Sequence, residues 1–273
     1  MQRSFAQLPV AILIAVAVGT PAAAAIKKVP YPEVKVELAD PYKPDAAFTA
    51  MHKAFGEAVK KKDDAALSTL VGQIFLWTMG DAIVDQYDRG RDALHNFKVA
   101  FGFRDAGKDA DGGVEGGPFW DLLASFATDE TAYLPNPENG NLVCTPTIAT
   151  IADDKVFDQA RNKIETKNEG ADWYFTVAET PVAKAPGDSG PPVGKVGKIA
   201  LPVLSAHPPT PEGKPTVTPT HYEVLMPSGK TGWVPASAVR PLSGDQLCYA
   251  KTPKGEWKIV AYDQPQEGDA EQQ

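Results

Sequence analysis

Ionisable side chains of the kind that do acid–base chemistry are grouped between residues 85 and 95. The group comprises Asp85, Asp88, Arg89, Asp92 and His95. Asp92 and His95 stand at the i, i+3 spacing that places two side chains on one face of a helix. A carboxylate beside an imidazole is an arrangement used in general acid–base catalysis. The group therefore indicates either a polar pocket or, as the alternative, a solvated loop followed by the start of a helix.

Other combinations of nucleophile, base and metal ligand do not match a familiar motif. His52, His207 and His221 are scattered, and no two histidines have the i, i+4 spacing that binds zinc from one helix. The run Gly229-Lys230-Thr231 would suit a phosphate-binding loop, but the glycine that such a loop needs five positions earlier is Val224. We therefore expect no catalytic residues of a familiar type, no bound metal ion and no cofactor.

The chain has two cysteines, Cys144 and Cys248, and two thiols allow one disulfide bond. A bond that closes a loop of this size would stabilise the fold by about 4–5 kcal/mol in the chain-entropy model. Cys144 lies at the end of a region that we expect to be helical, and Cys248 lies in a β-like run. A bond between them would join two domains. The alternative is a pair of separate thiols that act as small buried apolar side chains.

The N-terminal segment 1–25 has the three parts of a secretory signal peptide. Arg3 makes the start basic, residues 8–18 are apolar, and the Ala-rich segment 22–25 supplies a cleavage site of the Ala-x-Ala type. The apolar run is shorter than the span of about 20 residues that crosses a bilayer, and no later run is longer. We therefore predict that residues 1–25 are removed and that the mature protein is periplasmic or secreted, without a membrane span. An uncleaved anchor is the alternative.

The charge of the chain bears on its partners. The formal net charge is −8, and the one dense basic run, at residues 60–62, is followed at once by two aspartates. An acidic protein without a basic stripe repels phosphate backbones. We therefore expect no nucleic acid partner.

The first half of the chain has the periodicity of helices. Residues 26–44 are rich in proline and charge, and their alternating apolar residues indicate a short edge strand or an extended arm. In the first helix, Phe48, Met51, Phe55 and Val59 recur at steps of three and four residues and make one apolar stripe. Helices are expected at 45–62, from 63 or 64 onward, and at 90–103, 118–126 and 156–164.

The second half of the chain has short β-rich runs from Trp173 to Tyr262, cut by proline and glycine. Such a pattern is typical of a small all-β unit. We expect a closed barrel of five or six strands, with Trp233 and Trp257 on neighbouring strands, and a disordered acidic tail at 263–273. The predicted fold class is α+β: a mostly helical domain at 45–170 followed by a small β-barrel at 173–262.

The run Gly229-Lys230-Thr231-Gly232-Trp233-Val234, preceded by Tyr222–Met226 and followed by Val239-Arg240, resembles the distal hairpin and final strands of bacterial Src-homology-3 (SH3) domains. The resemblance implies an SH3-like barrel over residues 173–262. In SH3 barrels, exposed aromatic side chains receive extended or proline-rich peptides, and in bacterial relatives the barrel often contacts cell-wall peptides. Tyr222 and Trp233 are therefore candidate ligand-binding residues, with packing in the barrel core as the alternative role for both.

The first region carries a second resemblance. A helix with Phe55 and Val59, followed by residues 62–67 and then by Phe75-Leu76-Trp77, is similar to the opening of nuclear-transport-factor-like proteins. This resemblance implies a cone-shaped fold in place of a small helical domain.

These expectations lead to one principal functional hypothesis and two alternatives. The principal hypothesis is an exported accessory or binding protein of the cell envelope, whose SH3-like barrel contacts a peptide or a cell-wall polymer. The first alternative is an envelope enzyme with its pocket around residues 85–95. The second is a barrel with a purely structural role. The sequence carries no signal for a particular ligand or oligomeric state.

Overall fold

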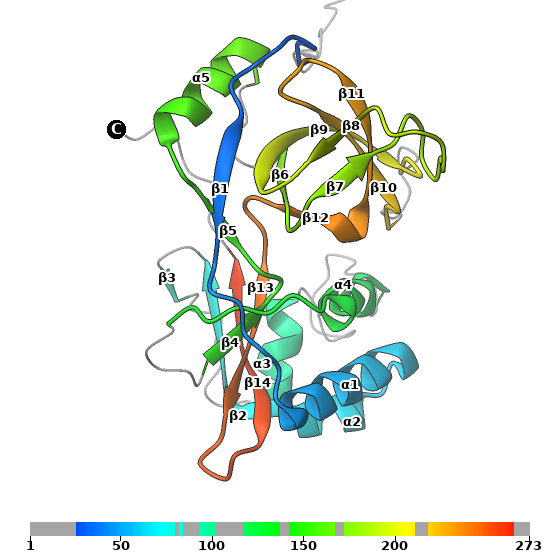
Figure 1. Cartoon of the computed structure of the whole chain (residues 1–273). Coiled ribbons are helices and arrows are strands. Elements are labelled where there is room, and N and C mark those ends of the chain that lie inside the picture. The colour runs from blue at the N-terminus through cyan, green and yellow to red at the C-terminus, as the bar shows by residue number, and fades with distance from the viewer. Residues whose placement is uncertain are drawn as a thin grey trace, which may run out of the picture.

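The computed structural model describes residues 26–79, 82–83, 93–101, 117–136, 142–166, 172–210 and 218–264. The expected signal peptide and most of the expected acidic tail lie outside these residues. Figure 1 shows two units, one above the other, each built around its own sheet. We define the lower unit as residues 40–145 with 246–264, and the upper unit as residues 26–39 with 146–245. None of the described helices is both long enough and apolar enough to cross a membrane.

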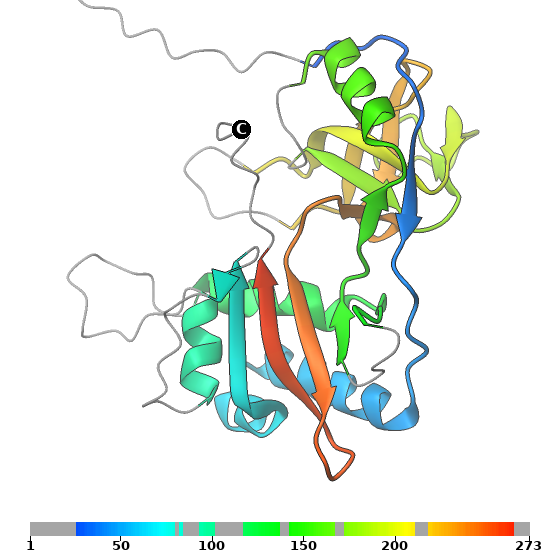
Figure 2. The ribbon, with the colours of Figure 1, turned by 90° about the vertical axis from the view of Figure 1, so that its left-hand side faces the viewer.

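In its described residues, the lower unit is a five-stranded sheet covered on one face by four helices (Figures 1 and 2). The strand order is β3-β2-β14-β13-β4, in which β2 and β14 run parallel and the other pairs run antiparallel. The strands are β2 (Val71–Met79), β3 (Ala82–Ile83), β4 (Leu142–Thr145), β13 (Gln246–Lys251) and β14 (Trp257–Gln264). The helices are α1 (Ala46–Lys61), α2 (Asp64–Leu70), α3 (Ala93–Ala100) and α4 (Gly117–Thr128).

Helix α1 follows from its sequence. The Asp45 carboxylate accepts a hydrogen bond from the backbone N–H of Phe48 at 2.7 Å, which satisfies a donor that the helix itself cannot pair. Lys62 ends the helix in a left-handed conformation, with φ 54°. The predicted stripe of Phe48, Met51, Phe55 and Val59 is buried, so the helix expected at 45–62 is confirmed.

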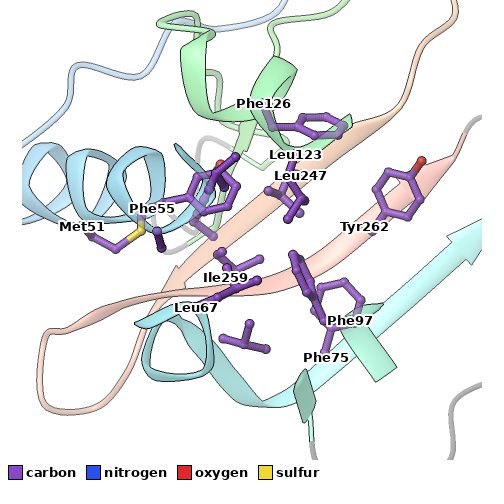
Figure 3. Packing of buried hydrophobic residues seen from close by; sticks show 14 of the residues in the cluster. Met51, Phe55, Leu67, Phe75, Phe97, Leu123, Phe126, Leu247, Ile259 and Tyr262 are labelled. Atoms are coloured by element: carbon purple, nitrogen blue, oxygen red, sulfur yellow. The ribbon is translucent and has the colours of Figure 1, made fainter. Parts of the chain in front are cut away.

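The core of the lower unit lies between the helices and the sheet. Figure 3 shows side chains from α1, α3 and α4 meeting side chains from the last two strands of the chain. Phe55, Phe97 and Ile259 have no exposed surface, and burying such a side chain contributes about 1.5–3 kcal/mol. Aromatic rings fill much of the space, with ring centroids of Phe75 and Phe97 5.1 Å apart and those of Phe101 and Tyr262 4.2 Å apart.

The prediction of a mostly helical N-terminal domain is therefore wrong. Among the described residues there is more strand than helix, 36% against 29%, and the five helices found there are short. Residues 71–79 form a strand, whereas the helix expected from 63 or 64 onward was to continue through Val71 and Ile74 and to be followed by an apolar cluster at 75–77. The helix ends at Leu70, and Ile74 is exposed. This strand pairs with β14, which comes from the far end of the chain. Periodicity is a local signal, and it does not identify a partner strand almost two hundred residues away.

The described part of the upper unit has a seven-stranded sheet, one α-helix and a separate two-stranded ladder. The path β11-β10-β9-β1-β5 is joined by β6, which pairs with both β9 and β12, while β7 pairs with β8. The strands are β1 (Val34–Leu38), β5 (Ala149–Ile151), β6 (Trp173–Thr176), β7 (Thr180–Val182), β8 (Gly194–Val196), β9 (Ile199–His207), β10 (His221–Leu225), β11 (Thr231–Pro235) and β12 (Val239–Pro241). Helix α5 (Asp154–Ile164) matches the helix expected at 156–164 but lies in this unit, and a short 3₁₀ turn (Ala236–Ala238) precedes β12.

The prediction of a closed barrel is also wrong, because among the described residues the strands of 173–262 do not close into one. Two of the expected barrel strands, β13 and β14, pair in the lower sheet, so Trp233 on β11 and Trp257 on β14 are not on neighbouring strands.

Strand β1, the alternating segment of the N-terminal arm, adds to the upper sheet by pairing with β5 and β9. The expected tail begins within a strand, since Asp263 and Gln264 continue β14.

The predicted disulfide pair is confirmed. Cys144 and Cys248 face each other in the register of β4 and β13, with Cα atoms 4.0 Å apart, and their sulfur atoms are bonded. Both strands belong to the lower sheet, so the bond does not join two domains as expected. The bond joins β4, after which the chain enters residues 146–245 of the upper unit, to β13, with which the chain returns to the lower unit. The bond therefore closes the base of an inserted segment.

Candidate functional site

The two aromatic candidates, Tyr222 and Trp233, lie on the β10–β11 hairpin. In its register, Tyr222 faces Val234 and Glu223 faces Trp233. Directly paired residues share a face of a sheet, and successive residues alternate between faces. Tyr222 and Trp233 therefore lie on opposite faces of the hairpin and do not form one site.

Tyr222 packs against the interior of the upper unit. Its ring centroid lies 4.9 Å from that of Tyr174, and it contacts a cluster that includes Val224 and Val234. This placement suits the alternative of a packing role.

Trp233 lies on the outer face and is partly exposed. Its ring meets the exposed ring of His207 edge to face, with centroids 6.0 Å apart. Glu223, its cross-strand neighbour, accepts a hydrogen bond from the Ser205 hydroxyl at 3.0 Å. We call Trp233, His207, His221, Glu223 and Ser205 the Trp233 face. It combines an aromatic ring with groups that can donate and accept hydrogen bonds.

The backbone holds Trp233 firmly in place. Its N–H donates to the Ala183 carbonyl at 2.9 Å, and its carbonyl accepts from the Ala183 N–H at 2.8 Å. The neighbouring Gly232 permits this approach. A Cβ atom there would lie 2.5 Å from Val182 Cγ1 and 2.8 Å from the Ala183 oxygen, which is closer than atoms can pack. The second glycine of the Gly-Lys-Thr-Gly-Trp-Val run is therefore required by packing.

Of the polar group expected around residues 85–95, only His95 lies within the described residues. It is partly exposed on α3. Asp85, Asp88, Arg89 and Asp92 lie outside the described residues. In the part of the chain that is described, no group of three or more His, Cys, Asp or Glu side chains is placed to hold a metal ion.

A second polar site was missed by the sequence reasoning. His52 lines a pocket between α1, the segment after α4 and the end of β4, together with Asp129 and Glu130. A signal was available, because His52 is four residues after Phe48 and three before Phe55 and thus interrupts the apolar stripe of α1. The two carboxylates, Asp129 and Glu130, come just after the helix expected at 118–126. No other feature of the sequence indicated a role for them.

Asp129 also connects the two units. One of its carboxylate oxygens lies 2.5 Å from Nε of Arg240 on β12, and both side chains are largely buried, with 11% and 14% exposed. Its other oxygen accepts hydrogen bonds from the backbone N–H and the hydroxyl of Thr131. The ion pair therefore fixes the position of Asp129 and links the upper unit to the end of α4.

Comparisons with known proteins found no matching family model, no similar curated protein and no similar solved structure.

Proposed function

We propose that this chain is an exported protein of the cell envelope whose upper unit binds a peptide or a cell-wall polymer through the Trp233 face. The signal-peptide pattern of residues 1–25 supports export. The Cys144–Cys248 bond is consistent with an oxidising compartment. The proposal includes kinship of the upper unit with bacterial SH3 domains, supported by the fact that the matching residues form the β10–β11 hairpin and β12.

The observation that carries the proposal is the placement of Trp233. Buried aromatic side chains need no explanation beyond packing, but this ring is partly exposed and surrounded by polar groups, and the backbone that carries it is held by two hydrogen bonds. Such rings bind extended chains by stacking at low cost in conformational entropy, because the backbone that carries the ring is already fixed and the side chain has few rotatable bonds. The polar neighbours add hydrogen bonds to amide or hydroxyl groups of the ligand.

Co-sedimentation with purified peptidoglycan tests the proposal. The mature protein should be retained in the pellet, and Trp233→Ala should reduce retention about tenfold, the size of effect expected when an aromatic anchor is removed. Tyr222→Phe is the matched control, because it alters an aromatic residue on the opposite face of the same hairpin. Absence of retention, or equal retention of the wild type and a folded Trp233→Ala variant, would contradict the proposal.

A structural role for the upper unit has one observation in its favour, the Arg240–Asp129 ion pair. Removing one partner of a largely buried pair leaves the other charge uncompensated. A double-mutant cycle with Arg240→Gln and Asp129→Asn should therefore give a coupling free energy of about 1–3 kcal/mol. A coupling near zero would show that the upper unit does not brace α4 through this pair. The structural role and the binding role do not exclude each other.

A further inference from the structure

The pocket lined by His52 lies in the lower unit and is separate from the Trp233 face. Its volume is about 360 Å³, within the range of about 300–1,000 Å³ that small-molecule sites occupy. Helix α1 contributes Phe48 and His52 to its lining, the segment after α4 contributes Asp129 and Glu130, and β4 contributes Thr145. Pro44 and Ala132 add apolar surface to the lining.

His52 is an ordered ring in the wall of this pocket. Its ring stacks on Phe48 at 5.9 Å with an interplanar angle of 15°, and it lies 6.1 Å from Tyr249. Burial lowers the pKa of His52, against the opposing effects of a hydrogen bond to the Phe126 carbonyl and of the two nearby carboxylates. The ring is therefore neutral near pH 7, with one nitrogen as an acceptor. Nε2 is enclosed and has no hydrogen-bond partner among the described residues.

The charges around the pocket favour a cation. Asp129 is held in place by Arg240, whereas the exposed carboxylate of Glu130 has no ion-pair partner in the described part of the chain. The C-terminal end of α4, at Thr128, immediately precedes these two residues, and the C-terminus of a helix carries partial negative charge. Lys53 also lines the pocket and is exposed. An anionic ligand would meet two carboxylates and a helix C-terminus.

We propose that this pocket binds a small aliphatic amine, with its ammonium group between Asp129 and Glu130 and its carbon chain against Phe48 and Ala132. An ammonium group has three donors, so it can pair with carboxylate oxygens of both Asp129 and Glu130. The apolar lining takes the carbon chain. The proposal does not depend on the binding activity of the upper unit, because no residue of the Trp233 face lines the pocket.

Three probes of similar length and different charge test the proposal on the full mature protein. They are 1,5-diaminopentane, 1,5-pentanediol and glutarate, and binding is followed by ¹H–¹⁵N NMR. Diaminopentane should give saturable shifts with a dissociation constant below about 10 mM, centred on α1 and on the residues after α4, whereas the diol and the diacid should bind at least about tenfold more weakly. No saturable shift with diaminopentane, or equal binding of the diol, would overturn the proposal.

Two variants place the binding at this pocket. Glu130→Gln removes an exposed carboxylate that is not needed for the fold, and it should weaken diaminopentane binding about fivefold or more, as expected for the loss of a charge-assisted hydrogen bond. Asp121→Asn is the matched control, because it removes one exposed negative charge from α4 outside the pocket lining. Equal weakening by both variants would mean that only the net charge matters and would overturn the assignment to this pocket.

Discussion

Single residues determine how closely the strands of the upper unit approach one another, and Gly232 is the clearest case. Its missing side chain lets β7 approach β11, so that Ala183 and Trp233 exchange two backbone hydrogen bonds. The sequence placed this glycine in a hairpin, but it did not show that the reason is a neighbouring strand. Gly229 has the reason that a turn glycine usually has, since its φ is +80°.

Gly232→Ala should lower the free energy of unfolding by about 1–3 kcal/mol, because the added methyl group would overlap Val182 and the Ala183 carbonyl. Thermal or urea unfolding measures the change. Gly255→Ala serves as the comparison: nothing lies within 4 Å of the added Cβ, and the φ of Gly255 is +80°, so only backbone strain of about 1 kcal/mol is expected. A Gly232→Ala variant as stable as wild type would mean that β7 does not approach β11 this closely.

At the scale of helices and strands, the helices with strong periodicity were predicted well. The sheet to which each strand belongs was not. Helices α1 and α5 have caps and apolar stripes within their own sequences, so local information was sufficient. Strand β2 lacks a clear alternation of apolar and polar residues. Its partner β14 follows the upper unit in the sequence, so their pairing is a long-range contact. The aromatic candidates show the same limit, because only strand register separates Trp233 on the outer face from Tyr222 on the inner face.

The N-cap of α1 is a test at this scale. Asp45 caps the helix and also binds Lys251 at 2.7 Å on β13, and these contacts lower its pKa to about 2. Asp45→Ala should cost about 1 kcal/mol of stability, and Asp45→Asn less, because asparagine is also a good N-cap. The pKa is lower in the folded state, so the contribution of the carboxylate is present above about pH 4 and is lost as the pH falls toward 2. The difference between wild type and Asp45→Asn should shrink over that range in unfolding experiments, and a difference that is constant with pH would contradict the assignment.

At the scale of the whole molecule, the chain passes between the two units more than once, and the disulfide bond closes two of these passages. The segments after β4 and before β13 both lead to the upper unit, and Cys144 and Cys248 stand at their ends in the lower sheet. The sequence identified the pair because there were only two cysteines. It did not identify the sheet in which they meet, because the return of β13 and β14 to the lower unit is a long-range feature.

Replacing both cysteines by alanine should lower the free energy of unfolding by about 2–5 kcal/mol, since the bond restricts a loop with a sequence separation of 104 residues in the unfolded chain. Hydrogen exchange should become faster in β4 and β13 first, where the bond lies. The protein isolated from an oxidising compartment should show no reactive thiol under denaturant. Two reactive thiols would contradict the bond.

The central claim, that Trp233 receives an envelope peptide or polymer, is tested most directly by the indole N–H signals of the protein. The chain has five tryptophans, and the signal of Trp233 is identified by its loss in Trp233→Phe. On titration with soluble peptidoglycan fragments, this signal should shift saturably, while the signal of the fully buried Trp173 should stay in place. A Trp233 signal that does not move at any concentration of these fragments would contradict the account.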